Sequence, residues 1–158
     1  MDPIKLGVIF DGGGFAGAHS AGYAKAVYAA GLKPIYIQGV SVGSLTGAGY
    51  AEDNGNPAKA EQIWLKTERE GSHAVFPTLD IARRIFKSSL FTSSGVYRLA
   101  DTLDYPALLA SSVRFDAVVY NETTGRQEIF SNYDPRCREN HLVLRQAIVA
   151  SCSLNGFL

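Results

Sequence analysis

The sequence places a serine between two glycines, directly after an apolar stretch and directly before a segment rich in small residues. Gly39-Val40-Ser41-Val42-Gly43 matches the pattern G-x-S-x-G, in which a sharp strand-to-helix turn lifts the serine hydroxyl above a sheet. The flanking glycines fit this turn, because a side chain at either position would collide with the neighbouring strand or helix. We therefore predict that Ser41 is a nucleophile.

Two elements must flank this serine if the pattern is to carry chemistry. Residues 34–38 (P-I-Y-I-Q) are typical of a short strand, and the Gly- and Ala-rich residues 44–51 predict a helix. The N-terminus of that helix would point at the serine and favour negative charge there. This strand–turn–helix context distinguishes the pattern from an ordinary turn that happens to contain glycine and serine.

A second glycine-rich segment follows an earlier apolar run, residues 6–10, which we expect to be a strand buried on both faces of a parallel sheet. Gly12, Gly14 and Gly17 satisfy G-x-G-x-x-G ahead of a helix expected over residues 18–30. A dinucleotide site with this pattern needs an acidic side chain about 20 residues later to bind the ribose. The G-x-S-x-G turn stands there instead, which disfavours the dinucleotide interpretation.

The glycine loop is suited to binding a developing negative charge. Glycines at the start of a helix leave several backbone N–H groups unpaired and pointing one way, and such donors stabilise the oxyanion of a carbonyl under attack. One helix and one strand separate Gly14 from Ser41. Adjacent parallel strands would bring both loops to the same carboxyl edge of the sheet, with the nucleophile facing the donors.

These two loops together resemble the patatin-like phospholipase family, which includes the cytosolic phospholipase A2-type enzymes. The matching residues are D-G-G-G-F-x-G after the first strand and G-V-S-V-G after the second. Residues 150–158 (A-S-C-S-L-N-G-F-L) are similar to the family segment A-S-x-x-x-P-G-F-F, with Asn155 in place of the proline. The resemblance touches both ends of the chain, whereas residues 71–112 add little to it.

The resemblance implies an α/β fold, a three-layer α/β/α sandwich with a mostly parallel central sheet. It also implies a Ser–Asp dyad that hydrolyses acyl esters of lipids through an acyl-enzyme, without a cofactor or a metal. By position Ser41 is the nucleophile, the N–H groups of Gly13 and Gly14 form the oxyanion hole, and the motif glycines are Gly12, Gly17, Gly39 and Gly43. Transfer of the acyl group to another alcohol would use the same intermediate. Ala16 stands where the family has Arg or Lys, which favours a neutral glyceride or simple ester over a phospholipid.

The aspartate of the dyad has no match in this sequence. The family places it in a D-G-G or D-G-A motif beyond the G-F-F segment, and no Asp after Ser41 precedes a glycine. We expect the other aspartates to be structural or solvated: Asp11, Asp101, Asp104, Asp116 and Asp134. Residues 1–158 are thus expected to be a single patatin-like domain truncated before that motif, with a C-terminal half or a partner chain supplying the base. A non-catalytic module that binds lipid or protein is the alternative.

A Ser–His–Asp triad is the nearest enzymatic rival and needs a histidine on a loop after the acid. His141 falls in a helix expected over residues 139–152, and His73 lies in a poorly defined segment. His19 follows the glycine loop and is expected on a helix surface. The triad is therefore disfavoured.

The rest of the pattern predicts an α/β layered protein. We expect a helix over residues 57–70, a turn at residues 93–95 before a short helix at 96–103, and a hairpin of strands 114–121 and 127–131. Gly47 and Gly49 inside the helix after Ser41 indicate close approach of that helix to the sheet.

Composition limits the partners. The chain has 158 residues, 46% of them hydrophobic, with 15 basic and 15 acidic side chains, so nothing indicates nucleic acid as a partner. The sequence predicts no signal peptide, and Cys137 and Cys152 are expected to be reduced; we expect a cytoplasmic protein. A helix expected at residues 78–87 has three cations beside an apolar stripe, which suits an ordinary surface helix or transient contact with a membrane surface. The expected partner is a lipid or ester substrate.

Overall fold

The computed structural model describes residues 5–71 and 94–153, which form one mixed sheet with helices packed against it. The strands are β1 (Leu6–Phe10), β2 (Pro34–Val40), β3 (Arg114–Asn121) and β4 (Arg126–Ser131). A 3-10 turn, η1 (Gly14–Ala16), leads into α1 (Gly17–Ala29), and α2 (Val42–Ala51) and α3 (Ala58–Glu70) follow β2. The later helices are α5 (Ser94–Ala100), α6 (Tyr105–Ala110), α7 (Pro135–Glu139) and α8 (His141–Cys152).

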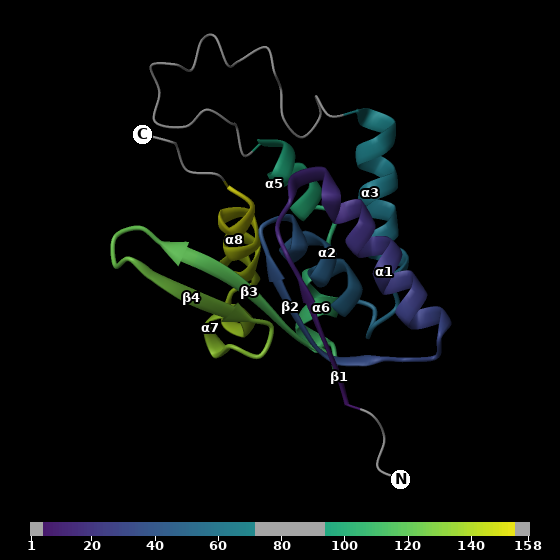
Figure 1. The fold of residues 1–158 in the computed structure, drawn as a ribbon. Helices are drawn as coiled ribbons and strands as arrows, with labels where there is room; N and C mark the ends of the chain where they lie inside the picture. The colour runs from purple at the N-terminus through teal and green to yellow at the C-terminus, as the bar shows by residue number, and fades with distance from the viewer. Residues whose placement is uncertain (1–4, 72–93, 154–158) are drawn as a thin grey trace.

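The sheet has the strand order β1-β2-β3-β4 (Figure 1). β1 pairs with β2 and β2 with β3 in parallel, while β3 and β4 form the expected antiparallel hairpin. Because β1 and β2 are adjacent and parallel, the loops that follow them leave the sheet at the same edge. The predicted α/β class with a mostly parallel sheet and helices packed on it is confirmed.

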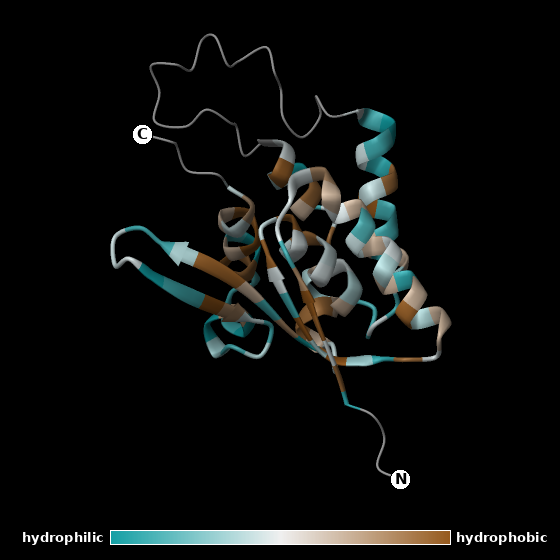
Figure 2. Ribbon diagram, in the orientation of Figure 1, coloured by the Kyte–Doolittle hydropathy of each residue, from teal (hydrophilic) through white to brown (hydrophobic). Residues whose placement is uncertain are grey.

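Helix α2 lies directly on the sheet and is buried at every residue. A methyl group on Gly47 would lie 3.0 Å from Ile37 Cγ2 and 3.1 Å from Phe115 Cε2, so the predicted close approach to the sheet is confirmed there. At Gly49 the close neighbour is α3 instead, since a methyl group would lie 3.1 Å from the backbone nitrogen of Ala60. Figure 2 shows hydrophobic residues along the strands and hydrophilic residues over much of α3.

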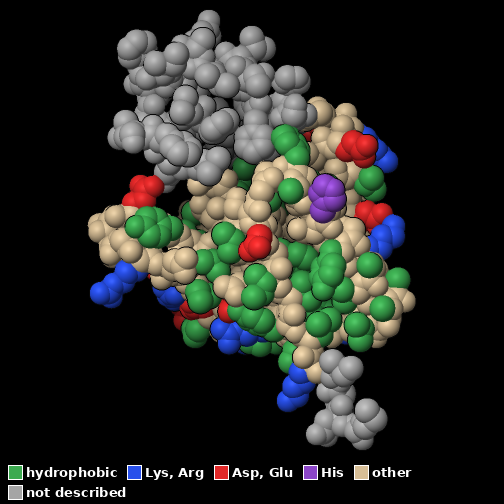
Figure 3. Space-filling model, viewed as in Figure 1, with side chains coloured by type: hydrophobic (Ala, Val, Ile, Leu, Met, Phe, Trp, Pro, Cys, Tyr) green, Lys and Arg blue, Asp and Glu red, His purple; other side chains and the backbone are tan. Residues whose placement is uncertain are grey.

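The expectation that β1 is buried on both faces is wrong for the described residues. Val8 and Phe10 face the core, but Ile9 on the opposite face is 65% exposed. Tyr120 and Ile129 are likewise exposed on the outward face of β3 and β4. Figure 3 shows hydrophobic side chains at the surface over the sheet. A continuous apolar run predicts a strand without specifying which of its faces is covered.

Two short helices were missed, and one turn was misassigned. Residues 94 and 95 belong to α5 rather than to a turn. α6 and α7 each begin at an aspartate N-cap with a proline in the first turn: Asp104 accepts from the N–H of Ala107, and Asp134 accepts from that of Arg136. The helix expected at residues 78–87 lies outside the described residues. None of the described helices is long and apolar enough to cross a membrane.

Candidate active site

Ser41 occupies the turn between β2 and α2 and has a backbone conformation that L-residues rarely adopt. Its φ is 54° and its ψ is −132°. A non-glycine residue held in such a conformation stores roughly 1–3 kcal/mol of strain, and such strain is concentrated at functional sites. Strand β2 ends at Val40 and α2 begins at Val42, so the chain reverses at the serine itself. The strand–turn–helix context expected for the G-x-S-x-G pattern is present.

The glycines on either side of Ser41 allow this turn to pack against backbone. A methyl group on Gly43 would lie 2.2 Å from the carbonyl oxygen of Phe10, at the end of β1. A methyl group on Gly39 would lie 2.5 Å from the carbonyl oxygen of Gly43 and 2.5 Å from Ser44 Cα. Real Cβ atoms do not approach other atoms so closely. Both positions therefore require glycine, and the turn is fixed against β1 and α2 through main-chain atoms.

The glycine loop after β1 lies against the side chain of Ser41. A methyl group on Gly12 would lie 3.0 Å from Ser41 Cβ and 3.6 Å from Ser41 Oγ. Gly13 and Gly14 follow with φ angles of 151° and 58°, which glycine adopts without strain. Within the described parts of the chain, neither the N–H of Gly13 nor that of Gly14 donates a hydrogen bond. The loop thus brings two unpaired amides to the edge of the sheet where the serine stands.

Gly17 anchors the far end of this loop. A methyl group there would lie 2.0 Å from Cζ2 of Trp64, so the first turn of α1 packs on the indole ring. The indole N–H in turn donates to Thr46 Oγ1 of α2 at 2.9 Å. The last glycine of the loop is therefore a packing residue that fixes α1 against α3.

The hydroxyl of Ser151, in α8, binds the backbone of the Ser41 turn. The Ser41 N–H donates to Ser151 Oγ at 2.8 Å, and Ser151 Oγ donates to the carbonyl oxygen of Val118 in β3 at 2.7 Å. Ser44 Oγ lies 3.0 Å from Ser151 Oγ. Because the single Ser151 proton goes to the Val118 carbonyl, Ser44 is the donor in that contact. One hydroxyl therefore joins the turn, α2, β3 and α8.

Ser151 and Ser44 were missed as site residues by sequence reasoning. Ser151 lies 110 positions after Ser41, and no spacing rule connects the two. The available signal was the A-S pair at Ala150 and Ser151, which belongs to the segment similar to the family motif. In the structure this serine supports the nucleophile candidate through its backbone.

Neither cysteine offers a competing nucleophile. Cys152 Sγ donates to the carbonyl oxygen of Ser41 at 3.0 Å, and burial raises the pKa of this thiol to about 12. Burial also raises the pKa of Cys137 to about 11. Both thiols are therefore protonated at neutral pH, and a thiol is a poor nucleophile until it ionises.

A small cavity opens beside the turn at the carboxyl ends of β2 and β3. It has a volume of about 290 Å³. Its lining comes from the strand ends, the β3–β4 turn and the end of α8: Val40, Val118, Tyr120, Glu122, Gln127, Ala150, Ser151 and Ser153. Glu122 is the one carboxylate in this lining, and the sequence indicated only a turn at that position.

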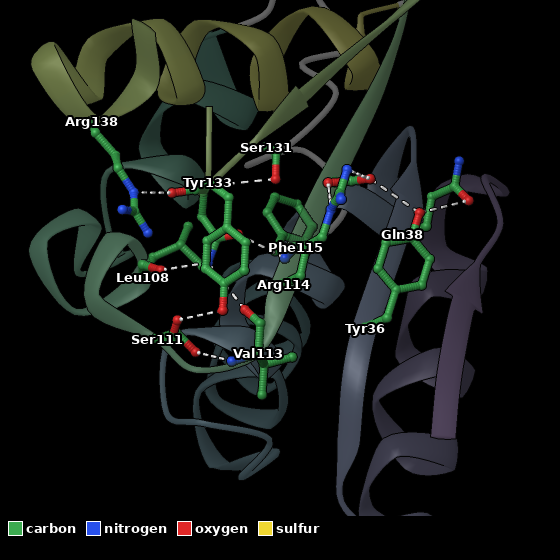
Figure 4. A network of polar contacts seen from close by, with 12 residues as sticks. Tyr36, Gln38, Leu108, Ser111, Val113, Arg114, Phe115, Ser131, Tyr133 and Arg138 are labelled. Carbon is green, nitrogen blue, oxygen red and sulfur yellow. Dashed lines mark hydrogen bonds and ion pairs between the residues drawn. The ribbon is translucent and has the colours of Figure 1, made fainter. Parts of the chain in front are cut away.

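Asp116 is buried within the sheet, where it pairs with Gln38 of β2. It is 2% exposed and lies near the start of β3, as expected. Its carboxylate accepts from the Tyr36 hydroxyl at 3.1 Å and from Arg114 Nε at 3.0 Å. Figure 4 shows Tyr36 and Arg114 extending toward one another from neighbouring strands. This aspartate ties β2 to β3, and both of its partners are structural.

The other candidate acids and bases have structural partners. Asp101 accepts from Arg145 Nε at 2.6 Å, and this bond lowers the pKa of Asp101. Asp104 and Asp134 cap helices, and the hydrogen bond from Arg136 lowers the pKa of Asp134. His141 is exposed at the start of α8, with its ring 5.8 Å from that of Tyr105.

Of the two remaining histidines, only His19 lies in the described chain. His19 is exposed on α1, as expected, and His73 lies outside the described residues. Over residues 5–71 and 94–153, the Ser41 hydroxyl makes no hydrogen bond and no group of three His, Cys, Asp or Glu side chains could hold a metal ion. The described site thus combines a serine hydroxyl with two unpaired glycine amides, and no acid or base is hydrogen-bonded to that hydroxyl within the described residues.

The comparison with protein families assigns the chain. The model of the family described as patatin-like phospholipase matches residues 8–158, a range that includes the glycine loop, the serine turn and the segment that carries Ser151. The chain therefore belongs to the patatin-like phospholipase family, whose activity at the family level is the hydrolysis of acyl esters of lipids.

Proposed function

We propose that this protein is a serine acyl hydrolase in which Ser41 attacks the ester carbonyl of a lipid. One observation carries the proposal: the strained serine turn lies against a glycine loop whose Gly13 and Gly14 amides have no partner in the described chain. Family membership supports the same chemistry. An unpaired amide pair beside an unpaired hydroxyl is the arrangement that acyl transfer requires.

The proposed reaction proceeds in two steps. Ser41 Oγ bonds to the carbonyl carbon while its proton passes to a carboxylate, and the N–H groups of Gly13 and Gly14 stabilise the oxyanion. Each such donor contributes roughly 3 kcal/mol to lowering the barrier. The leaving alcohol takes the proton and departs, which gives an acyl-enzyme. Water then adds to the carbonyl carbon of the acyl group while the carboxylate accepts a proton from the water. The carboxylic acid returns this proton to Ser41 Oγ as the bond to the acyl group breaks, and the fatty acid leaves.

The proton acceptor is the part of this proposal that the described residues do not supply. Asp101, Asp104, Asp116 and Asp134 have the structural partners given above. We assign the role to an aspartate outside residues 1–158, in further chain or in a partner. Without such a base a serine is a weak nucleophile at neutral pH.

The substrate is proposed to be an uncharged ester. Ala16 is exposed directly after the oxyanion loop, where the family has Arg or Lys, so this position has no cation to bind a phosphate. Hydrolysis rates measured with a monoacylglycerol and with a phosphatidylglycerol of the same acyl chain test whether the protein prefers an uncharged ester to a phospholipid. A higher kcat/KM for the monoacylglycerol supports the proposal, and a higher value for the phospholipid contradicts it.

Labelling with a fluorophosphonate probe tests the central role of Ser41. We expect the complete protein to be labelled on Ser41, and Ser41→Ala to lose both the label and at least about a thousandfold in ester kcat/KM. Ser153→Ala is the matched control, because Ser153 donates only to the carbonyl oxygen of Val149 in its own helix. Label retained in Ser41→Ala would refute the role of this serine. A complete protein that takes no label would instead be a non-catalytic module.

A further inference from the structure

Outside the serine turn, a hollow lies between α1 and α3, which run side by side in Figure 1. Its volume is about 530 Å³, within the range of roughly 300–1,000 Å³ that small-molecule sites have. The apolar part of its lining comes from both helices and the turn before α1: Phe15, Ala18, Ala21, Gly22, Trp64 and Leu65. Thr67, Glu68 and Gly71, from the second half of α3 and its end, also line it, together with Lys25 and Glu61. We call this hollow the α1–α3 groove.

The groove begins beside the oxyanion loop. Phe15 directly follows Gly14, and Gly12 lies against the Ser41 side chain. Three Cα–Cα steps separate Gly12 from Phe15, so these Cα atoms are at most about 11 Å apart. The hydrogen bond from the N–H of Ala16 to the carbonyl oxygen of Gly13, at 3.1 Å, folds this segment into a turn. A chain attached to the carbonyl carbon at Ser41 can therefore reach the groove.

The far end of the groove is charged. Lys25 and Glu61 line it there and form an ion pair of 2.7 Å between Nζ and Oε1. From Ala18 to Lys25 the groove follows α1 for seven residues, about 10 Å at the helical rise. A saturated chain advances roughly 1.25 Å per carbon, given C–C bonds of about 1.5 Å, so the apolar part holds about eight methylenes.

We propose that the α1–α3 groove binds the acyl chain of the ester that Ser41 attacks, an inference that rests on the proposed function. The groove joins a mainly apolar lining to a mouth beside the oxyanion donors, and it ends at an ion pair that an apolar chain would not pass. An acyl chain is the part of a lipid ester that is long, uncharged and attached directly to the reacting carbonyl. Chains too short to reach Phe15 gain nothing from the groove, whereas longer ones bury methylenes in it.

Gly22 provides a variant that fills the groove without disturbing the fold. A methyl group on Gly22 has no neighbour within 4 Å, and replacing a helical glycine also favours the helix. We expect Gly22→Leu to lower kcat/KM for a hexadecanoyl 4-nitrophenyl ester at least about tenfold, since each buried methylene is worth roughly a factor of four. The butanoyl ester should be hydrolysed as by the wild type. Ala26→Leu, an exposed position on the same helix outside the groove lining, is the control and should change neither rate.

A binding measurement keeps the groove testable if no ester is turned over. Trp64 lines the groove and is the only tryptophan of the chain, so its fluorescence reports occupancy. We expect decan-1-ol to shift its emission saturably in the wild type, in Ser41→Ala and in Ala26→Leu, and at least about tenfold more weakly in Gly22→Leu. Butan-1-ol at the same concentration should have no effect.

The two measurements separate the two proposals. An equal loss of rate for butanoyl and hexadecanoyl esters in Gly22→Leu, or no loss for either, overturns the assignment of the groove. Absence of a saturable shift with decan-1-ol also overturns it. The protein could also show the saturable shift, weakened in Gly22→Leu, yet neither hydrolyse esters nor take the fluorophosphonate label. That result would support the groove as a site for apolar chains and would refute the proposed hydrolase activity.

Discussion

At its carboxyl edge the sheet meets α2 and the glycine loop mainly through backbone, whereas around the first residues of β3, which we call the amino edge, side chains join the strands. Gly12 and Gly43 let main-chain atoms approach Ser41 and Phe10 more closely than any side chain would allow. At the other edge, Asp116 and Asn132 accept or donate several hydrogen bonds each. The same sheet is therefore fixed by steric fit at one edge and by polar pairing at the other.

The two edges differ in whether their polar side chains have hydrogen-bond partners. Asn132 is fully buried; its Oδ1 accepts from the N–H of Phe115 at 2.8 Å, and its Nδ2 donates to the carbonyl oxygens of Leu108 and Val113 at 2.9 and 3.0 Å. Ser41 is partly exposed and its hydroxyl has no partner in the described chain. A satisfied amide stabilises the fold, whereas an unpaired hydroxyl in a strained turn is free to react.

The steric fit at the carboxyl edge is broken by the smallest possible side chain. We expect Gly43→Ala to lower the free energy of unfolding by about 3 kcal/mol or more, because its methyl group would lie 2.2 Å from a backbone oxygen that cannot move aside. Urea unfolding followed by circular dichroism measures the change. Gly22→Ala is the control, and we expect it to raise stability by about 0.5–1 kcal/mol. A Gly43→Ala protein as stable as the wild type would show that the turn tolerates a side chain.

The polar pairing at the amino edge is broken by removing one amide. Asn132→Ala removes the side-chain partner of the Phe115 N–H and of the Leu108 and Val113 carbonyl oxygens, of which that of Leu108 keeps the N–H of Ser111. We expect the change to lower the free energy of unfolding by about 2–3 kcal/mol. Labelling of Ser41 by a fluorophosphonate, measured on folded protein, should keep its rate.

An exposed asparagine gives the reference for this change. Asn140 accepts from the N–H of Leu142 at the start of α8, and Asn140→Ala should lower stability by only about 1 kcal/mol. If Asn132→Ala slowed the labelling of Ser41 in folded protein, the two edges would be coupled and the comparison would not hold.

The sequence predicted the carboxyl edge better than the amino edge. The strands at residues 6–10 and 114–121 follow from apolar and β-branched runs between turn residues, and the positions of Ser41 and the glycine loop follow from the alternation of strand and helix. Asn132 gave no signal, because an asparagine after a strand usually marks a turn. Its role depends on Leu108 and Phe115, which approach it only in the folded chain.

The missed helices show what local rules could have added. Both α6 and α7 begin with aspartate followed within two residues by proline, at Asp104 and at Asp134. An aspartate N-cap with proline in the first turn is a helix start signal, but the segments are too short for apolar periodicity to reveal them. The exposure of Ile9 could not be predicted, because burial of a strand face depends on which elements pack against it.

The Ser151 hydroxyl is a polar side-chain contact at the carboxyl edge, where most other contacts are made by backbone. Ser151→Ala removes the acceptor of the Ser41 N–H and the bond to the Val118 carbonyl. We expect the free energy of unfolding to fall by about 1–2 kcal/mol. The rate of fluorophosphonate labelling at Ser41 should fall about tenfold, since a turn held less firmly presents its hydroxyl in the reactive position less often.

Ser153→Ala distinguishes this effect from a general loosening of α8. Ser153 lies two residues after Ser151, and its hydroxyl donates to the carbonyl oxygen of Val149 at 2.8 Å rather than to the serine turn, so the removal of this hydroxyl should leave the labelling rate unchanged. If Ser151→Ala and Ser153→Ala were labelled at equal rates, the conformation of Ser41 would depend on the glycines alone. The carboxyl edge would then be held by steric fit without any help from a side chain.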